Sequence, residues 1–153
     1  MTQAQEEVTS ENTQLKFKEW AQTEYVKIRK FCATKGYRVT NVNQKKCRYL
    51  APQIAVWYVR TEDKNDDLWV VSGEFPTDLA PSKVAKNARE VLRHFSLAWQ
   101  LQAANLEEVI AEKNINLTDK ETKARFSQQL IQRAESLYSI YDNEKLWEKA
   151  GLQ

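Results

Sequence analysis

The segment Ile54–Ser72, IAVWYVRTEDKNDDLWVVS, decides the fold. Its first six residues are apolar on both strand faces, which is typical of a central strand, and it ends in a second apolar run, LWVVS. The polar stretch Thr61–Asp67 lies between the two runs and predicts a turn. We therefore predict an antiparallel hairpin whose strands span residues 54–60 and 67–73.

A helical pattern precedes the hairpin. From about Thr13, apolar residues recur within one helical arc, and Gly36 supplies the left-handed stop. Residues 1–12 are polar and aperiodic, which predicts a frayed tail, whereas residues 37–43 alternate weakly, as a third strand would. We therefore predict one domain over residues 13–153, preceded by the tail.

Three helical segments follow the hairpin. Residues 82–113 carry the strongest apolar stripe and predict one helix about 48 Å long. The capping box Thr118–Glu121 opens a second helix that continues to Tyr141, and a short last helix is predicted at residues 144–150. The fold class is therefore α+β: an N-terminal helix, a three-stranded antiparallel meander, then a long helix and one or two further helices packed on the sheet. Because so long a helix would overhang a compact globule, we expect a homodimer formed through it.

Composition excludes several classes of protein. The chain has 153 residues, 42 % of them hydrophobic, and its 23 basic and 21 acidic side chains nearly cancel, so it is not a histone-like protein. One histidine and two cysteines are too few for a closed zinc site, and we predict no metal and no cofactor. Glycine-rich phosphate loops and a nucleophile elbow are absent.

The expected location is the cytoplasm. The chain has no apolar run of roughly 18 residues or more, so we expect no membrane association, and its acidic start is unlike a signal peptide. Cys32 and Cys47 are then expected to be reduced and packed.

Basic side chains concentrate near the N-terminus. Residues 14–48 hold ten basic side chains against Glu19 and Glu24. This pattern predicts either a basic surface for nucleic acid or an acidic partner, or an ordinary solvated helix face. The candidate basic surface comprises Lys16, Lys27, Arg29, Lys30, Lys45 and Lys46. Four aromatic residues are available there for stacking on bases: Trp20, Tyr25, Tyr37 and Tyr49.

Two polar residues fall where the helical pattern predicts apolar ones. Glu24 lies inside the apolar arc of the first helix, and Gln102 lies near the stripe of the long helix. Because an unpaired buried carboxylate is strongly disfavoured, we expect Glu24 to pair with a basic side chain. A catalytic carboxylate is the alternative interpretation.

The connection Ser72–Asp78 is the most unusual in the chain. It combines Gly73 with a proline and two carboxylates, Glu74 and Asp78, and loops held between rigid elements often carry sites. The simpler interpretation is a strand-to-helix turn capped by Thr77 or Asp78. We predict a binding surface that comprises Arg48, Tyr49, Trp69, Ser72, Gly73, Glu74, Thr77, Asp78, Arg89, Arg93 and His94.

Three blocks of sequence carry a resemblance. They are Arg48–Trp57, Trp69–Asp78 and Ala88–Leu101, which contain RYLAP, WVVSGEFPTD and RHFSLAWQL. The chain resembles a family of small uncharacterised proteins of Gram-negative bacteria, classed as a domain of unknown function, over about residues 15–115. The resemblance implies a bacterial, cytoplasmic, stand-alone domain and brings no catalytic residue.

Three classes of function remain open at this point. We favour a non-enzymatic protein-binding or adaptor module that binds a protein partner. A nucleic-acid-associated protein using residues 14–48 is the alternative. A small enzyme using Glu74, Asp78 and His94 is a third class, for which the sequence offers no paired nucleophile and base.

Overall fold

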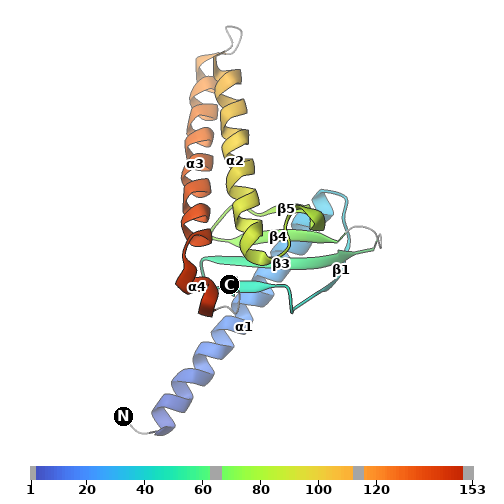
Figure 1. Cartoon of the computed structure of the whole chain (residues 1–153), viewed down its shortest axis with the longest axis vertical. Coiled ribbons are helices and arrows are strands. Elements are labelled where there is room, and N and C mark those ends of the chain that lie inside the picture. Colours follow the sequence, from blue (N-terminus) through green and yellow to red (C-terminus); the bar gives the residue numbers. More distant parts are fainter. Residues whose placement is uncertain (1–2, 63–66, 112–115, 150–153) are drawn as a thin grey trace. The chain divides into compact units, whose positions relative to one another are not determined.

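The computed structural model describes residues 3–62, 67–111 and 116–149, with side chains from residue 11 onward. The chain divides into two units, Met1–Ser82 and Lys83–Gln153, and each is described by itself. The first holds a helix and a sheet, and the second holds a helical hairpin (Figure 1). That residues 13–153 form one domain stays a prediction.

Unit one is an antiparallel sheet with a helix against one face. Within the described residues the sheet has five strands, in the order β1-β3-β4-β5, and β2 also pairs with β3. Since β4 pairs along one flank of β3, both β1 and β2 lie on its other flank. The elements are α1 (Gln3–Thr34), β1 (Val39–Val42), β2 (Arg48–Leu50), β3 (Ile54–Thr61), β4 (Leu68–Gly73) and β5 (Asp78–Pro81).

The predicted hairpin is confirmed by β3 and β4, in which Trp57 stands opposite Val70. The predicted weak strand at residues 37–43 corresponds to β1. The prediction of three strands is wrong, because β2 and β5 complete the sheet. Both added strands are three or four residues long, too short for their side chains to establish a period.

Helix α1 packs on the sheet through its C-terminal half. It begins at Gln3, earlier than the start predicted near Thr13. The predicted stop at Gly36 is confirmed: φ is 89° there, and Tyr37 N–H donates to the Cys32 carbonyl at 2.9 Å. Core residues shared by α1 and the sheet are Ile28, Cys32, Val39, Cys47, Ala55, Trp57, Val59, Leu68 and Val70.

Unit two is a pair of antiparallel helices followed by a short one (Figure 1). They are α2 (Ala88–Ile110), α3 (Leu117–Tyr141) and α4 (Glu144–Lys149), and a 3₁₀ turn, η1 (Ser82–Val84), precedes α2. Two buried hydroxyl groups on the facing sides of the hairpin join α2 and α3: Ser96 Oγ donates to Ala134 O at 2.7 Å, and Ser127 Oγ donates to Ala103 O at 3.3 Å.

The predicted helix of residues 82–113 is shorter than expected. Asn87 caps α2, because its side-chain oxygen accepts a hydrogen bond from Glu90 N–H at 3.0 Å, so the helix begins at Ala88. Its length is about 34 Å. The helix therefore has its partner, α3, in the same chain, and the length argument for a homodimer loses its force; the dimer stays a prediction.

One further prediction about these helices is wrong. Asn116, and not the box at Thr118, caps α3, through a hydrogen bond from Asp119 N–H at 2.8 Å. Gln102 is exposed. Because Gln102 is not buried, it needs no buried partner.

Candidate functional site

Lys27 joins α1 to the end of β4. Its Nζ lies 2.9 Å from Glu24 Oε1 and donates a hydrogen bond to the Gly73 carbonyl at 3.3 Å. Glu24 is buried, and its predicted pairing with a basic side chain is confirmed. Its other oxygen, Oε2, is buried without a hydrogen-bond partner among the described residues. Because a buried carboxylate needs compensation, the ammonium group of Lys27 stabilises this contact between helix and sheet.

Ser72 and Gly73 end β4 in a confined place. Ser72 is fully buried, and its Oγ accepts a hydrogen bond from Trp57 Nε1–H at 3.1 Å. Gly73 has φ of 113°, and a Cβ added there would press on Gln53 O and lie 2.9 Å from Ile54 Cα. Glycine is therefore required at this position for both its conformation and its size.

Residues 74–77 connect two strands, β4 and β5, and not, as predicted, a strand and a helix. Glu74 is exposed, and its backbone N–H donates to Gln53 O at 2.9 Å. Thr77 is partly buried. Asp78 opens β5, and its Oδ1 accepts a hydrogen bond from Leu79 N–H at 2.8 Å. Asp78 thus has a structural role at the start of an edge strand.

Three other residues of the predicted binding surface lie in the sheet. Arg48 Nη1 donates to the carbonyls of Lys45 at 2.8 Å and Cys47 at 2.7 Å, which closes the turn before β2. Trp69 is 1 % exposed, and its Nε1–H donates to Ser82 O at 3.1 Å. Tyr49 is partly exposed and donates to Gln44 Oε1 at 2.8 Å, and burial raises the pKa of its phenol. Of the three, Tyr49 is the one whose ring lines an open groove.

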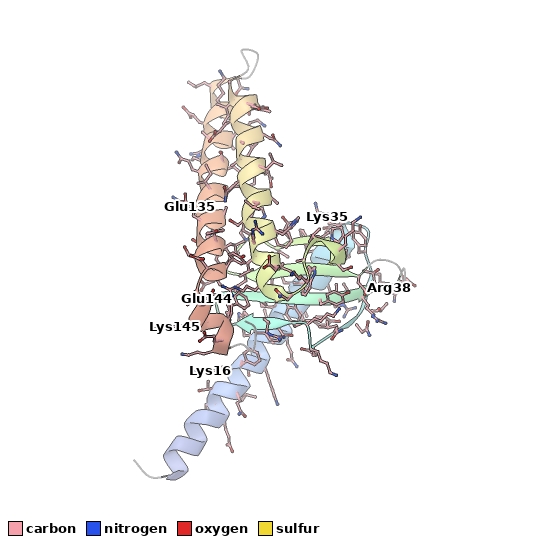
Figure 2. The ribbon with its side chains drawn as sticks, viewed as in Figure 1. Lys16, Lys35, Arg38, Glu135, Glu144 and Lys145 are labelled. Carbon is pink, nitrogen blue, oxygen red and sulfur yellow. The ribbon has the colours of Figure 1, made fainter. Side chains whose placement is uncertain are left out.

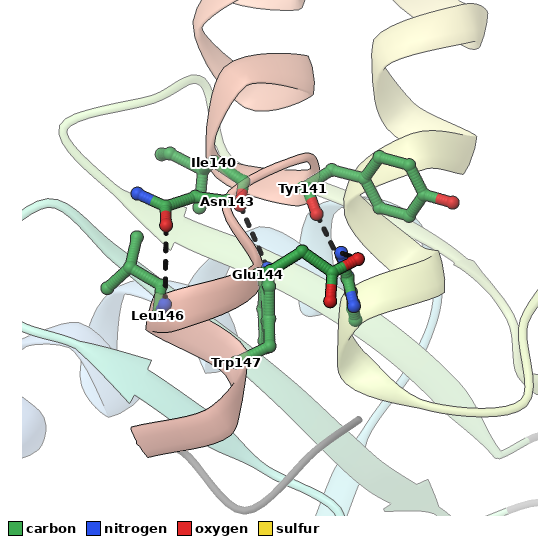
Figure 3. A network of polar contacts seen from close by, with 7 residues as sticks. Ile140, Tyr141, Asn143, Glu144, Leu146 and Trp147 are labelled. Carbon is green, nitrogen blue, oxygen red and sulfur yellow. Dashed lines mark hydrogen bonds and ion pairs between the residues drawn. The ribbon is translucent and has the colours of Figure 1, made fainter.

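The remaining predicted residues belong to unit two. Arg89 ties the start of α2 to the end of α3, because its Nε–H donates to Tyr141 O at 2.9 Å. Figure 3 shows Tyr141 and Glu144 at the junction between α3 and α4. Its Nη2 also lies 3.3 Å from Glu144 Oε1. Arg93 is exposed, and His94 stacks edge-on against Phe95. Arg89 therefore holds the helices together.

An aromatic groove lies between α1 and the strands β1 and β2. Its volume is about 620 Å³. Within it the Tyr49 ring meets Trp57 and Phe17 edge-on, with centroid separations of 5.1 and 5.7 Å. Tyr25 lies 5.9 Å from Trp57. The other lining side chains include one cation, Lys18, and four uncharged polar groups: Gln22, Thr40, Asn41 and Gln44.

A basic hollow of about 630 Å³ lies further along the same helix. Arg29 and Lys30 of α1 and Arg38 before β1 line it, together with Tyr37 and small or apolar residues. Figure 2 shows Arg38 near the end of the unit where α1 finishes, with Lys16 far back along α1. Glu62 Oε2 lies 3.9 Å from Arg38 Nη1, and both side chains are largely exposed. Such an ion pair is weak, so the hollow keeps its positive charge.

The predicted basic surface is divided among several places. Arg29 and Lys30 line the basic hollow, whereas Lys27 pairs with Glu24 and Lys46 lies over the Tyr58 ring at 4.3 Å. Lys16 and Lys45 are exposed outside both cavities. Of the aromatic residues proposed for stacking, Tyr25 and Tyr49 line the groove and Tyr37 lines the hollow, but Trp20 lines neither.

Phe17 and Arg38 are residues of these cavities that the predicted surfaces omitted. Phe17 falls within the apolar arc of α1, and 38 % of its surface is nevertheless exposed. The sequence signal that could have revealed the groove is an aromatic residue at the start of the apolar arc. Nothing in the local sequence distinguishes Arg38 from its basic neighbours.

Both cysteines are buried free thiols. Burial raises the pKa of Cys32 to about 11. Burial also raises the pKa of Cys47, against the smaller effect of a hydrogen bond from the Tyr58 backbone. Since the thiolate is the reactive form, neither thiol is activated.

The described residues offer neither a metal site nor a membrane span. In residues 11–62, 67–111 and 116–149, no group of three His, Cys, Asp or Glu side chains is placed to hold a metal ion. Among the helices described, none has the length and apolar character needed to span a bilayer.

The fold defines an α+β protein that combines a helix-covered antiparallel sheet with a helical hairpin. A sequence model of the family described as a domain of unknown function, DUF4826, matches residues 13–147. The chain belongs to this family. No curated protein and no solved structure matches it significantly.

Proposed function

We propose that the protein is a non-enzymatic binding module that takes an extended segment of a partner protein in the aromatic groove. The observation that carries this proposal is the exposure of Phe17 and Tyr49 beside Trp57, next to a sheet edge. Aromatic side chains supply much contact area for little loss of conformational entropy, and protein interfaces are enriched in them.

An enzymatic role has less support in the arrangement of the side chains. Asp78 makes a hydrogen bond within β5, and Glu74 is exposed in the connection before it. His94, the third residue of that hypothesis, belongs to the other unit, where its ring meets Phe95. None of these contacts pairs a nucleophile with a base.

Binding of nucleic acid is the second candidate. It is favoured by the three tyrosines among basic residues in the two cavities. Phosphate contacts weaken steeply as salt rises, whereas apolar contacts in an aromatic groove do not, so salt dependence separates the two candidates.

The proposal is tested by affinity capture from a lysate of a Gram-negative bacterium, the source that the sequence resemblance implies. The bait is compared as wild type, Phe17→Ser and Phe126→Ser, at high salt, each with and without nuclease treatment. Phe126 is the matched control because it is an exposed phenylalanine on α3, outside the groove. We expect a protein that wild type and Phe126→Ser retain and Phe17→Ser loses. Equal capture by all three baits, or capture abolished by nuclease, would contradict the proposal.

A further inference from the structure

The aromatic groove and the basic hollow follow one another along one flank of α1. Tyr25 lines the groove and the next residue, Val26, lines the hollow. Arg29 of the hollow lies over the Tyr25 ring, with Cζ 5.7 Å from the centroid. Strand β1 forms the opposite wall: Thr40–Val42 line the groove and Val39 lines the hollow. We call the two together the α1–β1 trough.

The wall formed by β1 is a sheet edge. Among the described strands β1 pairs with β3 alone, so its other side presents backbone groups that an added strand can pair with. Lining residues on α1 run from Phe17 to Ala33, a distance of about 24 Å along the helix axis. An extended chain covers that distance with about seven residues.

The described charged residues that line the trough are all basic. Lys18 lines the groove, and Arg29, Lys30 and Arg38 line the hollow, whereas among the residues that the structure describes no carboxylate lines either cavity. Glu62 makes a long, exposed contact with Arg38. Complementary charge steers association and fixes the register of a bound segment.

We infer that the α1–β1 trough binds an acidic extended segment of a partner protein, about seven residues long, which pairs with the β1 edge. An apolar or aromatic side chain of the segment enters the groove against Phe17, Tyr49 and Trp57. A carboxylate of the segment, several residues away, meets Arg29 and Arg38 in the hollow. This inference rests on the proposed function and specifies the chemistry of its partner.

The test is selection of a random octapeptide display library against the whole chain, followed by affinity measurements on the selected peptides. We expect peptides that combine an apolar or aromatic residue with acidic ones. Arg29→Ala and Arg38→Ala together should weaken their binding by about tenfold or more, because tenfold corresponds to about 1.4 kcal/mol, which is no more than one charge-assisted hydrogen bond contributes. Lys16→Ala, which removes an exposed charge of the same helix outside the trough, should change the affinity by less than about twofold.

The outcomes distinguish failure of the proposed binding module from failure of the inference that its partner segment is acidic. Selected peptides without acidic residues, lost on Phe17→Ser but unaffected by the arginine substitutions, would overturn the acidic partner and leave the binding module standing. Failure to select any peptide that depends on Phe17 would overturn both. Oligothymidylate that binds the whole chain more tightly than every selected peptide, at the same salt concentration, would overturn the acidic segment in favour of nucleic acid.

Discussion

The ammonium group of Lys27 donates a hydrogen bond to the carbonyl oxygen of Gly73, 46 positions further along the chain, at 3.3 Å. The same group neutralises Glu24 one helical turn earlier. This residue, which the charge pattern alone places on a basic surface, thus fastens α1 to the sheet. The consequence is that its removal should act on stability and not on binding.

Replacing Lys27 by Met should lower the free energy of unfolding by about 1–3 kcal/mol, because Glu24 would stay buried without its partner. The expected loss of unfolding free energy is modest because 41 % of the Lys27 side chain is exposed, so solvent screens its interaction with Glu24. The double variant Glu24→Leu with Lys27→Met should recover most of the loss, since it removes both charges. Urea unfolding of the three proteins measures this. A single variant as stable as wild type would show that Lys27 contributes nothing here.

Replacing Gly73 by Ala should destabilise the protein more than replacing Gly36 by Ala. Both residues have positive φ, and the left-handed conformation costs an alanine about 1 kcal/mol. At Gly36 the added Cβ meets nothing within 4 Å, whereas at Gly73 it presses on Gln53 and Ile54. We expect about 1 kcal/mol at Gly36 and about 2–4 kcal/mol at Gly73, from thermal or urea unfolding. Equal losses would mean that β4 shifts away from Gln53 without cost.

The unfolding free energy should fall between pH 9 and pH 11 because of Cys32. Burial raises its pKa to about 11 in the folded protein, above the value of an exposed thiol near 8.5. The folded state therefore holds the proton over this range while the unfolded state loses it, so the contribution to stability is full below pH 8.5 and is lost as the pH approaches 11.

Cys32→Ala isolates this effect from the other groups that titrate in alkali. Its unfolding free energy should be lower than that of wild type at pH 8, but it should decline less steeply by about 1–3 kcal/mol up to pH 11. Parallel curves for the two proteins would contradict a raised pKa at Cys32.

Replacing Arg89 by Ala should loosen α4, because the substitution removes the hydrogen bond to Tyr141 O and the ion pair with Glu144. Amides of residues 144–149 should exchange with solvent about tenfold faster or more, which corresponds to about 1.4 kcal/mol. Arg93→Ala is the matched control, since Arg93 is an exposed arginine on the same helix. Equally fast hydrogen exchange in both variants would show that Arg89 does not stabilise α4.

Two helix ends show where the local sequence is sufficient to predict a helix boundary and where it is not. Gly36 stops α1 because the left-handed conformation is a property of that residue and its two neighbours. Asn87 begins α2 because its side-chain oxygen accepts a hydrogen bond from the backbone N–H three residues further on. The apolar stripe alone does not mark this start, because it continues on both sides of Asn87. The stripe predicted the helix, and the cap decided its start.

The sequence by itself determined the α+β class, the β3–β4 hairpin, the end of α1 and the burial of Glu24, because each depends on side-chain periodicity or on a neighbour within one helical turn. Tertiary structure alone decided the strands β2 and β5, which form by hydrogen bonding to β3 and β4. It also decided the α1–β1 trough, since Arg29 and Arg38 come to line one hollow only after the chain reverses at Gly36. The periodicity of apolar side chains predicts which face of a helix or strand is buried, but it does not predict which distant element packs against that face.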